Sequence, residues 1–249
     1  MPYKPNLTLI PENISGKLPV NELFYSIQGE GRWLGTPAVF IRFQYCNLGC
    51  AFCDSKYTWH QQLSSEATLH NPDDLSVQAA SIVPQSIMKG NPPHVVLTGG
   101  EPMLHQNRIP ALISELKTVG FEYFEIETNG TIIPDQDMLT AINWWNCSPK
   151  LSINLLSKEK YLNPYAIRTI AGSKKADFKF VIRNHKDFEE IEASYGKLIS
   201  PHQIWLMPEG VNRDDQILSM REIADICIRK GYHFSPRLHI LIWNNEKGY

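Results

Sequence analysis

The chain of 249 residues has neither a long apolar run nor an excess of basic charge. No apolar stretch approaches the roughly 20 residues of a membrane-spanning helix, which argues against a membrane protein. Its 24 Lys and Arg against 26 Asp and Glu give a net charge of −2, so a nucleic-acid-binding surface is not expected. No linker, repeat or low-complexity segment divides it. We therefore expect one domain over residues 1–249, with an N-terminal extension (1–20) and a C-terminal tail (231–249).

Cysteine is scarce, and three of the five cysteines lie together in Cys46-Asn-Leu-Gly-Cys50-Ala-Phe-Cys53. The odd number and the lack of a secretory leader argue against disulfides and favour the cytoplasm, where thiols stay reduced. A [4Fe–4S] cluster usually takes four cysteines, so three at this spacing would leave one iron without a protein ligand. Cys147 and Cys227 are far away in sequence and are expected to be buried as small apolar residues.

The cysteine loop, with the aromatic Phe52 before its last cysteine, resembles the signature of the radical S-adenosylmethionine (radical SAM) superfamily. That resemblance implies that the methionine part of SAM occupies the open iron, and that cluster reduction cleaves SAM to a 5′-deoxyadenosyl radical. The residues alone predict only a three-cysteine cluster with a free coordination site. A zinc site completed by His60 or His70 is an alternative reading of the same loop.

Short apolar runs alternate with amphipathic helical patterns, which is typical of βα units on a parallel sheet. The predicted strands cover residues 38–43, 94–98, 123–127, 144–148, 177–182 and 204–207. The predicted helices cover residues 75–89 (with a kink at Pro84), 106–119, 186–195 and 214–230. Six strands are too few for an eight-stranded barrel. We therefore expect an α/β fold, an incomplete (β/α)6 TIM-like barrel of the radical SAM type.

Polar motifs follow the predicted strands, at the edge where ligands bind in parallel βα architectures. They are Thr98-Gly-Gly-Glu-Pro102, Glu127-Thr-Asn-Gly-Thr131, Ser148-Pro-Lys150 and Met207-Pro-Glu-Gly210. Paired glycines let a ligand approach the backbone closely, and a hydroxyl with a cation suits a ribose and a carboxylate. From the motifs and the resemblance, the expected SAM contacts are Phe52, Asp54, Gly100, Glu101, Ser148, Pro149, Lys150 and Met207.

A second group of motifs narrows the resemblance. Phe24-Tyr-Ser-Ile-Gln-Gly-Glu-Gly31, Ser148-Pro-Lys150 and the tail from Leu238 to Tyr249 are similar to those of the 7-carboxy-7-deazaguanine synthases, radical SAM lyases of 7-deazapurine and queuosine biosynthesis. The resemblance implies conversion of 6-carboxy-5,6,7,8-tetrahydropterin to 7-carboxy-7-deazaguanine with loss of ammonia and regeneration of SAM. An activating enzyme for glycyl-radical enzymes is the alternative, since the first motif also occurs in such relatives.

A pterin presents an amide edge, an amine and, here, a carboxylate. Gln28 and Glu30 offer matching hydrogen-bond partners, and Arg42 can bind a carboxylate with two parallel bonds, although it could also form an ordinary salt bridge. The tail is expected to close over the substrate. The expected substrate contacts are Ile27, Gln28, Gly29, Glu30, Arg42, Thr98, His239 and Tyr249.

The resemblance also implies a Mg²⁺ ion that touches the substrate and one protein hydroxyl. The matching position is Ser55, where some members carry Thr, and either hydroxyl offers the oxygen that a hard cation prefers. An electron donor such as flavodoxin or ferredoxin and a homodimer are further implications. The partners expected for the chain are thus a small molecule and a reductant, with no membrane and no nucleic acid.

Overall fold

A computed structural model of the chain describes residues 14, 16–60, 67–244, 246 and 248. Within these residues, nine strands form one open sheet in the order β3-β1-β2-β4-β5-β6-β7-β8-β9. The strands are β1 (Leu18–Ile27), β2 (Pro37–Phe43), β3 (Thr68–His70), β4 (His94–Gly99), β5 (Phe124–Thr128), β6 (Trp144–Cys147), β7 (Ala176–Ile182), β8 (Ile204–Pro208) and β9 (His233–Phe234). Neighbouring strands from β2 to β9 pair in parallel, whereas β1 pairs antiparallel with β2 and β3.

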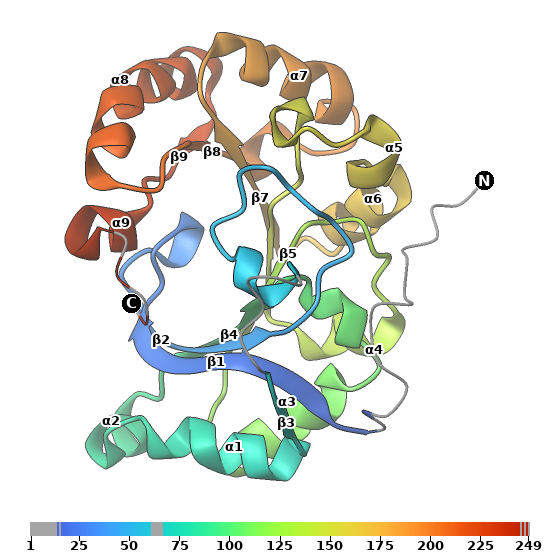
Figure 1. Ribbon diagram of the computed structural model, residues 1–249, viewed down its shortest axis with the longest axis vertical. Helices are drawn as coiled ribbons and strands as arrows, with labels where there is room; N and C mark the ends of the chain where they lie inside the picture. Colours follow the sequence, from blue (N-terminus) through green and yellow to red (C-terminus); the bar gives the residue numbers. More distant parts are fainter. Residues whose placement is uncertain (1–13, 15, 61–66, 245, 247, 249) are drawn as a thin grey trace.

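Helices surround the curved sheet on its outer side (Figure 1). The α-helices are α1 (Pro72–Ser81), α2 (Gln85–Gly90), α3 (Ile109–Thr118), α4 (Gln136–Ala141), α5 (Lys158–Tyr161), α6 (Pro164–Gly172), α7 (His185–Tyr195), α8 (Arg213–Lys230) and α9 (Leu238–Trp243). The 3-10 helices are η3 (Gly31–Trp33), η4 (Lys56–Thr58), η5 (Pro102–His105), η6 (Ser152–Asn154) and η7 (Pro201–Gln203). In the part of the chain that is described, no helix has the length and apolar character needed to span a bilayer.

Local signals explain where the long helix α8 begins and ends. The Asn212 side chain accepts a hydrogen bond from the backbone N–H of Asp215 at 2.9 Å, which satisfies a donor of the first turn. Gly231 ends the helix with a φ of 73°, a conformation that favours glycine. Acidic residues in the first turn and basic residues in the last turn complement the helix dipole.

The six predicted strands are confirmed as β2 and β4 to β8, with ends that differ by at most one residue. The predicted continuous helix over residues 75–89 is wrong, because α1 ends at Ser81 and α2 begins at Gln85. Pro84 separates the two helices with ψ at 133°, so the chain breaks there and does not merely kink. The edge strands β3 and β9, strand β1 beside β3, and the helices α4, α5, α6 and α9 were not predicted. Strand β1 begins at Leu18, so the end of the expected N-terminal extension belongs to the sheet.

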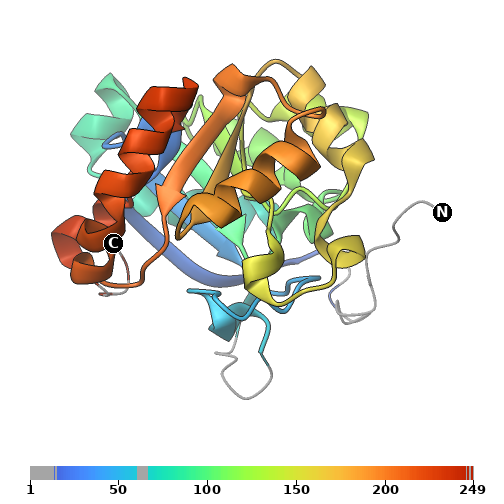
Figure 2. The ribbon, with the colours of Figure 1, turned by 90° about the horizontal axis from the view of Figure 1, so that it is seen from above.

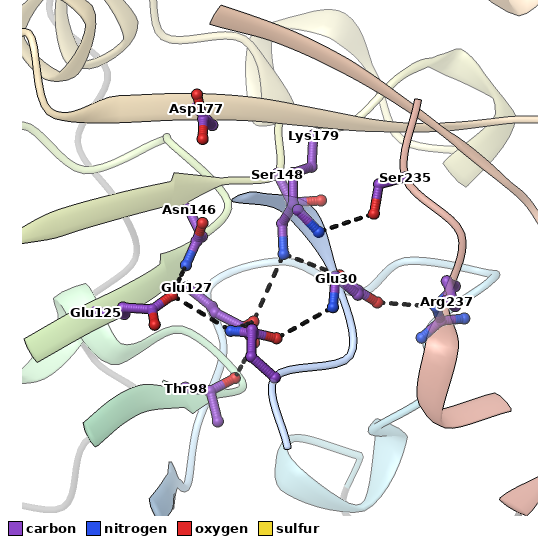
Figure 3. Close-up of polar contacts among 12 residues, drawn as sticks. Glu30, Thr98, Glu125, Glu127, Asn146, Ser148, Asp177, Lys179, Ser235 and Arg237 are labelled. Atoms are coloured by element: carbon purple, nitrogen blue, oxygen red, sulfur yellow. Dashed lines mark hydrogen bonds and ion pairs between the residues drawn. The ribbon is translucent and has the colours of Figure 1, made fainter. Parts of the chain in front are cut away.

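Alternation along the strands separates an apolar outer face from a polar inner face. In β5 and β7, the outward residues Phe124, Ile126, Phe178 and Phe180 are fully buried in the main core between sheet and helices. Charged residues alternate with these phenylalanines and isoleucines and turn inward, as their hydrogen bonds across the interior show (Figure 3). On the inner face, Ala38, Phe40 and Val96 form a small apolar cluster with Phe24 against it. The inner face of the incomplete barrel is thus the more polar of the two faces.

The segment between β9 and α9 is joined to the turn that follows β1. The backbone N–H of Leu238 donates to the carbonyl of Gly29 at 2.8 Å, and the N–H of Gly31 donates to Ser235 Oγ at 2.8 Å. Figure 1 accordingly shows α9 beside the turn that follows β1. The loop after β2 projects from the opposite side to most of the helices in Figure 2, over the ends of the parallel strands.

Candidate active site

A cavity with an empty volume of about 1210 Å³, part of it open to solvent, lies at the carboxyl ends of the parallel strands. The predicted site residues that line it are Glu30, Cys46, Cys50, Phe52, Cys53, Asp54, Ser55, Thr98, Gly100, Ser148, Pro149, Lys150 and Met207. The structure thus brings together most of the predicted SAM residues, the three cysteines and part of the predicted substrate site.

The cysteine loop reaches the cavity directly from the end of β2. The thiols of Cys46, Cys50 and Cys53 are all free, and the loop packs on Tyr161 and its neighbours. The indole N–H of Trp59 points at Cys53 Sγ at 3.4 Å. Burial raises the pKa of the Cys46 and Cys50 thiols, and the Lys150 cation opposes this only in part at Cys50, so the thiolates need further positive charge. A metal cluster supplies that charge, so this donor set fits one.

The same geometry argues against a single zinc ion. Among the described residues, no three His, Cys, Asp or Glu side chains converge at the spacing of one metal ion. A tetrahedral zinc ion draws its ligands together at about 2.3 Å each, whereas a cubane binds each thiolate through a different iron. His70 lies on β3 with its ring 3.4 Å from the Gln78 amide, and neither His60 nor His70 lines the cavity. The zinc reading therefore finds no support in the structure.

The glycine pair after β4 is required by the cysteine loop itself. A Cβ on Gly100 would lie 2.2 Å from the carbonyl oxygen of Tyr45, and one on Gly99 would lie 2.3 Å from that of Phe43. Gly99 also has a φ of 141°, which side chains rarely allow. The two loops are joined here, since the N–H of Gly100 donates to Phe43 O at 3.1 Å. The pair was predicted to admit a ligand, and it also admits the neighbouring backbone.

Glu101 differs from the other expected SAM contacts, because it does not line the cavity. Its carboxylate is fully buried and accepts hydrogen bonds from the N–H of Met103 at 3.0 Å, from Thr128 Oγ1 at 2.7 Å and from the N–H of Asn129 at 2.7 Å. Burial raises the pKa of Glu101 to about 6 against the effect of these donors. In this structure Glu101 connects the loop after β4 to the loop after β5.

The loops after β5 and β6 complete the wall on the cluster side. Asn129 Nδ2 donates to Asn47 Oδ1 at 2.9 Å, and Asn47 Nδ2 donates to Thr131 Oγ1 at 2.8 Å. The Thr-Asn-Gly-Thr motif therefore holds the cysteine loop in place. Ser148 and Lys150 face the cavity together, with Lys150 Nζ 3.2 Å from Ser148 Oγ.

The turn after β1 supplies the opposite wall. Glu30 and Thr98 line the cavity, and Thr98 Oγ1 donates to a carboxylate oxygen of Glu127 at 2.8 Å. Gln28 lies deeper, 1% exposed, with its amide nitrogen 3.4 Å from Glu125 Oε2 and 3.5 Å from Glu127 Oε1. Gln28 does not line the cavity, and its side chain lies among the inward-facing acids.

Arg42 also stands behind the cavity wall. Its Nε donates to Glu22 Oε2 at 2.6 Å, and Tyr57 donates to the same oxygen at 2.9 Å. The ordinary salt bridge considered from the sequence is therefore present. Arg42 is nevertheless in register with Thr98 on the adjacent strand, so it is adjacent to the cavity wall on the inner face. Ile27, the last residue of β1, is half-buried and does not line the cavity.

Gly29 and His239 are in direct contact. A Cβ on Gly29 would lie 2.0 Å from His239 Nδ1, so only glycine leaves room for this ring. Burial lowers the pKa of His239, although the nearby Glu30 opposes this effect. Neither residue lines the cavity. The expected contact from Tyr249 lies outside the described residues.

Several charged and polar residues in and behind the cavity wall were missed from the sequence. Glu125, Asn146, Asp177 and Lys179 are buried on the inner face, and Arg237 reaches the cavity from the segment before α9 (Figure 3). A signal was present for the strand residues: Phe124-Glu-Ile-Glu-Thr and Ala176-Asp-Phe-Lys-Phe alternate charged and apolar residues in strands expected to be buried on both faces. For Arg237 the local sequence carried no such signal.

Comparison with known proteins agrees with this geometry. The sequence model of the radical SAM superfamily matches residues 40–220. The chain is similar to 7-carboxy-7-deazaguanine synthases of Halobacterium salinarum (34% identity, 92% of this chain and 91% of the relative) and Pyrobaculum aerophilum (35% identity, 93% and 97%). It also resembles the crystal structure of QueE from Escherichia coli, with a TM-score of 0.66 and 27% identity over 92% of this chain and 99% of that one. The chain therefore belongs to the radical SAM superfamily and, within it, to the family of 7-carboxy-7-deazaguanine synthases.

Proposed function

We propose that the chain converts 6-carboxy-5,6,7,8-tetrahydropterin to 7-carboxy-7-deazaguanine and ammonia, as a step of 7-deazapurine and queuosine biosynthesis. The family supports the reaction through the names of relatives that match over almost their whole length. The observation that carries the proposal is a cavity that has free cysteine thiols on one wall and the carboxylate of Glu30 on the other. A cluster-bound reagent and a small polar substrate can therefore meet there.

The cluster wall suits the cofactors of the superfamily. Cys46, Cys50 and Cys53 would hold three irons of a [4Fe–4S] cluster, with the fourth iron left for SAM. When bound, the reduced cluster and SAM supply the 5′-deoxyadenosyl radical that abstracts hydrogen from the substrate. The residues proposed to bind SAM are Phe52, Asp54, Gly100, Ser148, Pro149, Lys150 and Met207, which share the cavity, and Glu101, which supports the loops beside it.

The opposite wall suits the pterin. Glu30 offers an acceptor for the amide edge and the amine, Thr98 offers a hydroxyl, and both line the cavity. Arg42 is the proposed partner of the substrate carboxylate, supported by its register with Thr98. The remaining proposed contacts are close to Glu30. Ile27, Gln28 and Gly29 precede it in the chain, and His239 belongs to the segment docked on this turn. Tyr249, the last proposed contact, lies outside the described residues.

Further parts of the proposal concern the ion and the partners. We propose that Ser55 contributes its hydroxyl to a Mg²⁺ ion, which it can do from the cavity wall while the substrate and water complete the coordination. We expect a flavodoxin or ferredoxin as the electron donor, a homodimer in solution, and work in the cytoplasm, where the free thiols stay reduced.

An anaerobic assay of the reconstituted protein tests the function. The protein is incubated with SAM, dithionite, Mg²⁺ and the carboxytetrahydropterin, and the deazaguanine is measured by mass spectrometry. We expect product in excess of the SAM consumed, because SAM is regenerated. Stoichiometric SAM cleavage without this product would contradict the proposal, and omission of Mg²⁺ tests the ion separately.

A further inference from the structure

Five side chains of alternating charge connect the cysteine loop to strand β5, and we name them the ion chain: Asp54, Arg237, Glu30, Lys179 and Glu127. Arg237 pairs with Asp54, and its Nε lies 2.9 Å from Glu30 Oε1. Lys179 Nζ lies 2.9 Å from Glu30 Oε2 and 3.5 Å from Glu127 Oε1. Each member comes from a different segment of the fold, and Figure 3 shows Glu30 between the two cations.

The centre of the ion chain is shielded from water. The side chain of Lys179 is 2% exposed, that of Arg237 is 11% exposed and that of Glu30 is 17% exposed. At such burial, removing one partner leaves an uncompensated charge, unlike at an exposed salt bridge. Gly31 packs on the Lys179 stem, since a Cβ there would lie 3.1 Å from Lys179 Cδ. The ion chain is therefore a fixed part of the site.

Glu30 and Lys179, at the centre of the ion chain, stay ionised in the physiological range. Burial would raise the pKa of Glu30, yet Lys179 and Arg237 hold it well below its usual range. Burial would lower the pKa of Lys179, yet Glu30 and Glu127 raise it above its usual range. Groups that stay ionised do not transfer protons at neutral pH. Their arrangement points to positioning.

The members of the ion chain connect the cysteine loop to the turn after β1. Asp54 directly follows Cys53 in the cysteine loop, whereas Glu30 belongs to the proposed substrate turn. Arg237 joins the two and also donates from a terminal guanidinium nitrogen to the carbonyl of Gly210, after β8, at 3.2 Å. Lys179 then ties Glu30 to Glu127 across the interior. All except Lys179 line the cavity.

We infer that the ion chain sets the position of the substrate turn relative to the cysteine loop, with Arg237 and Lys179 as positioning residues, so that radical formation is coupled to reaction of the substrate. This inference rests on the proposed function. A radical reagent reacts productively only when the target hydrogen lies within reach, and a displacement of about 1 Å can cost about 100-fold in rate. Loss of either cation should therefore leave SAM cleavage intact while the radical misses its target.

The test compares Arg237→Gln and Lys179→Met with Lys230→Gln as the control. Lys230, at the end of α8, also forms an ion pair, with Nζ 3.5 Å from Glu192 Oε1, but it does not line the cavity and is not part of the ion chain. The reconstituted holoenzymes are assayed for the ratio of 5′-deoxyadenosine to deazaguanine. We expect this ratio to rise at least about tenfold in the two variants and to stay unchanged in the control.

Readouts other than turnover separate positioning from loss of structure. Iron content and the electron paramagnetic resonance signal of the reduced cluster with SAM should match the wild type in every variant. Calorimetric affinity for the carboxytetrahydropterin should fall in the two test variants alone. Arg237→Lys keeps the charge but lacks the branched donor group that contacts Asp54, Glu30 and the carbonyl of Gly210. We expect this variant to fold like the wild type and to show an intermediate ratio of 5′-deoxyadenosine to deazaguanine. It keeps the test valid if a neutral variant does not fold.

The outcomes distinguish a failure of the proposed role of the ion chain from a failure of the proposed function. Suppose that the wild type makes deazaguanine. If Lys179→Met and the Arg237 variant that folds then show the same low ratio of 5′-deoxyadenosine to deazaguanine and the same affinity for the carboxytetrahydropterin as the wild type, the role of the ion chain is overturned. If the control shows the same rise as the test variants, the effect belongs to ion pairs in general, and the role is again refuted. If the wild type makes no deazaguanine, the proposed function itself fails.

Discussion

A methyl group added at Gly29 tests whether the segment before α9 is docked tightly on the substrate turn. The added Cβ would lie 2.0 Å from His239 Nδ1 and 2.9 Å from its Cγ, far inside van der Waals contact. Gly29 is not among the glycines with positive φ, so alanine fits its backbone. The cost of Gly29→Ala therefore comes from the steric conflict with His239.

The magnitude follows from the burial of the contact. Insertion of a methyl group into a packed site typically costs about 1–3 kcal/mol, and each kcal/mol lowers the melting temperature of a chain of this size by about 2–4 °C. His239→Ala removes the obstacle, so the double variant should be no less stable than His239→Ala alone. The coupling energy between the two substitutions should then be about 1–3 kcal/mol.

Urea unfolding followed by circular dichroism measures the four free energies of the cycle. Gly90→Ala is the control, since a Cβ on Gly90 meets no atom within 4 Å, and its effect should stay below about 1 kcal/mol. If Gly29→Ala costs the same with and without His239, the docking contact described above does not exist. Product formation should fall in Gly29→Ala as well, because His239 is displaced from the turn.

Burial lowers the pKa of His105 from 6.5 to about 4, so the unfolded chain takes up this proton at a higher pH than the folded chain. The free energy of unfolding should therefore fall by about 3 kcal/mol as the pH drops from 6.5 to about 4. In urea unfolding across that range, His105→Leu should lack this loss. Cys53→Ser should abolish the iron–sulfur absorbance after reconstitution, whereas Cys147→Ala should retain it; retention in both would contradict the assigned ligands. Gly100→Ala should destabilise the fold more than Gly29→Ala, since its Cβ would meet the backbone of Tyr45 at 2.2 Å, and an equal or smaller loss in the same unfolding assay would refute that reading.

The central strands were predictable because their outer faces are apolar. Residues such as Phe124 and Ile126 are buried beneath helices, and the local pattern of apolar residues predicts this burial. Strand β1 was missed because its residues beyond Val20 are only half-buried and pair with another strand on one side alone. The position of the break at Pro84 was predicted correctly, but a kink was expected where the helix in fact ends. A proline can do either.

The site was predictable as far as its residues form motifs next to one another. The cysteines, the glycine pair and Ser148 to Lys150 follow strand ends, and parallel strands bring such ends together. Lys179 and Arg237 could not be assigned in this way, because their partners are distant in sequence and only the fold brings them into contact. The alternation of charged and apolar residues along β7 was a signal for buried polar contacts, but it does not show which groups meet.

The hydrogen bond between Gly31 and Ser235 joins positions 204 residues apart, and the strands from β2 to β9 all lie between them in the sequence. On the ribosome, the turn after β1 emerges early and must wait for this partner until most of the chain has been synthesised. Contacts of such separation also form slowly in refolding. The cavity is consequently completed after the sheet, and a nascent chain halted before Ser235 would hold its cysteine loop but lack the finished wall around Glu30.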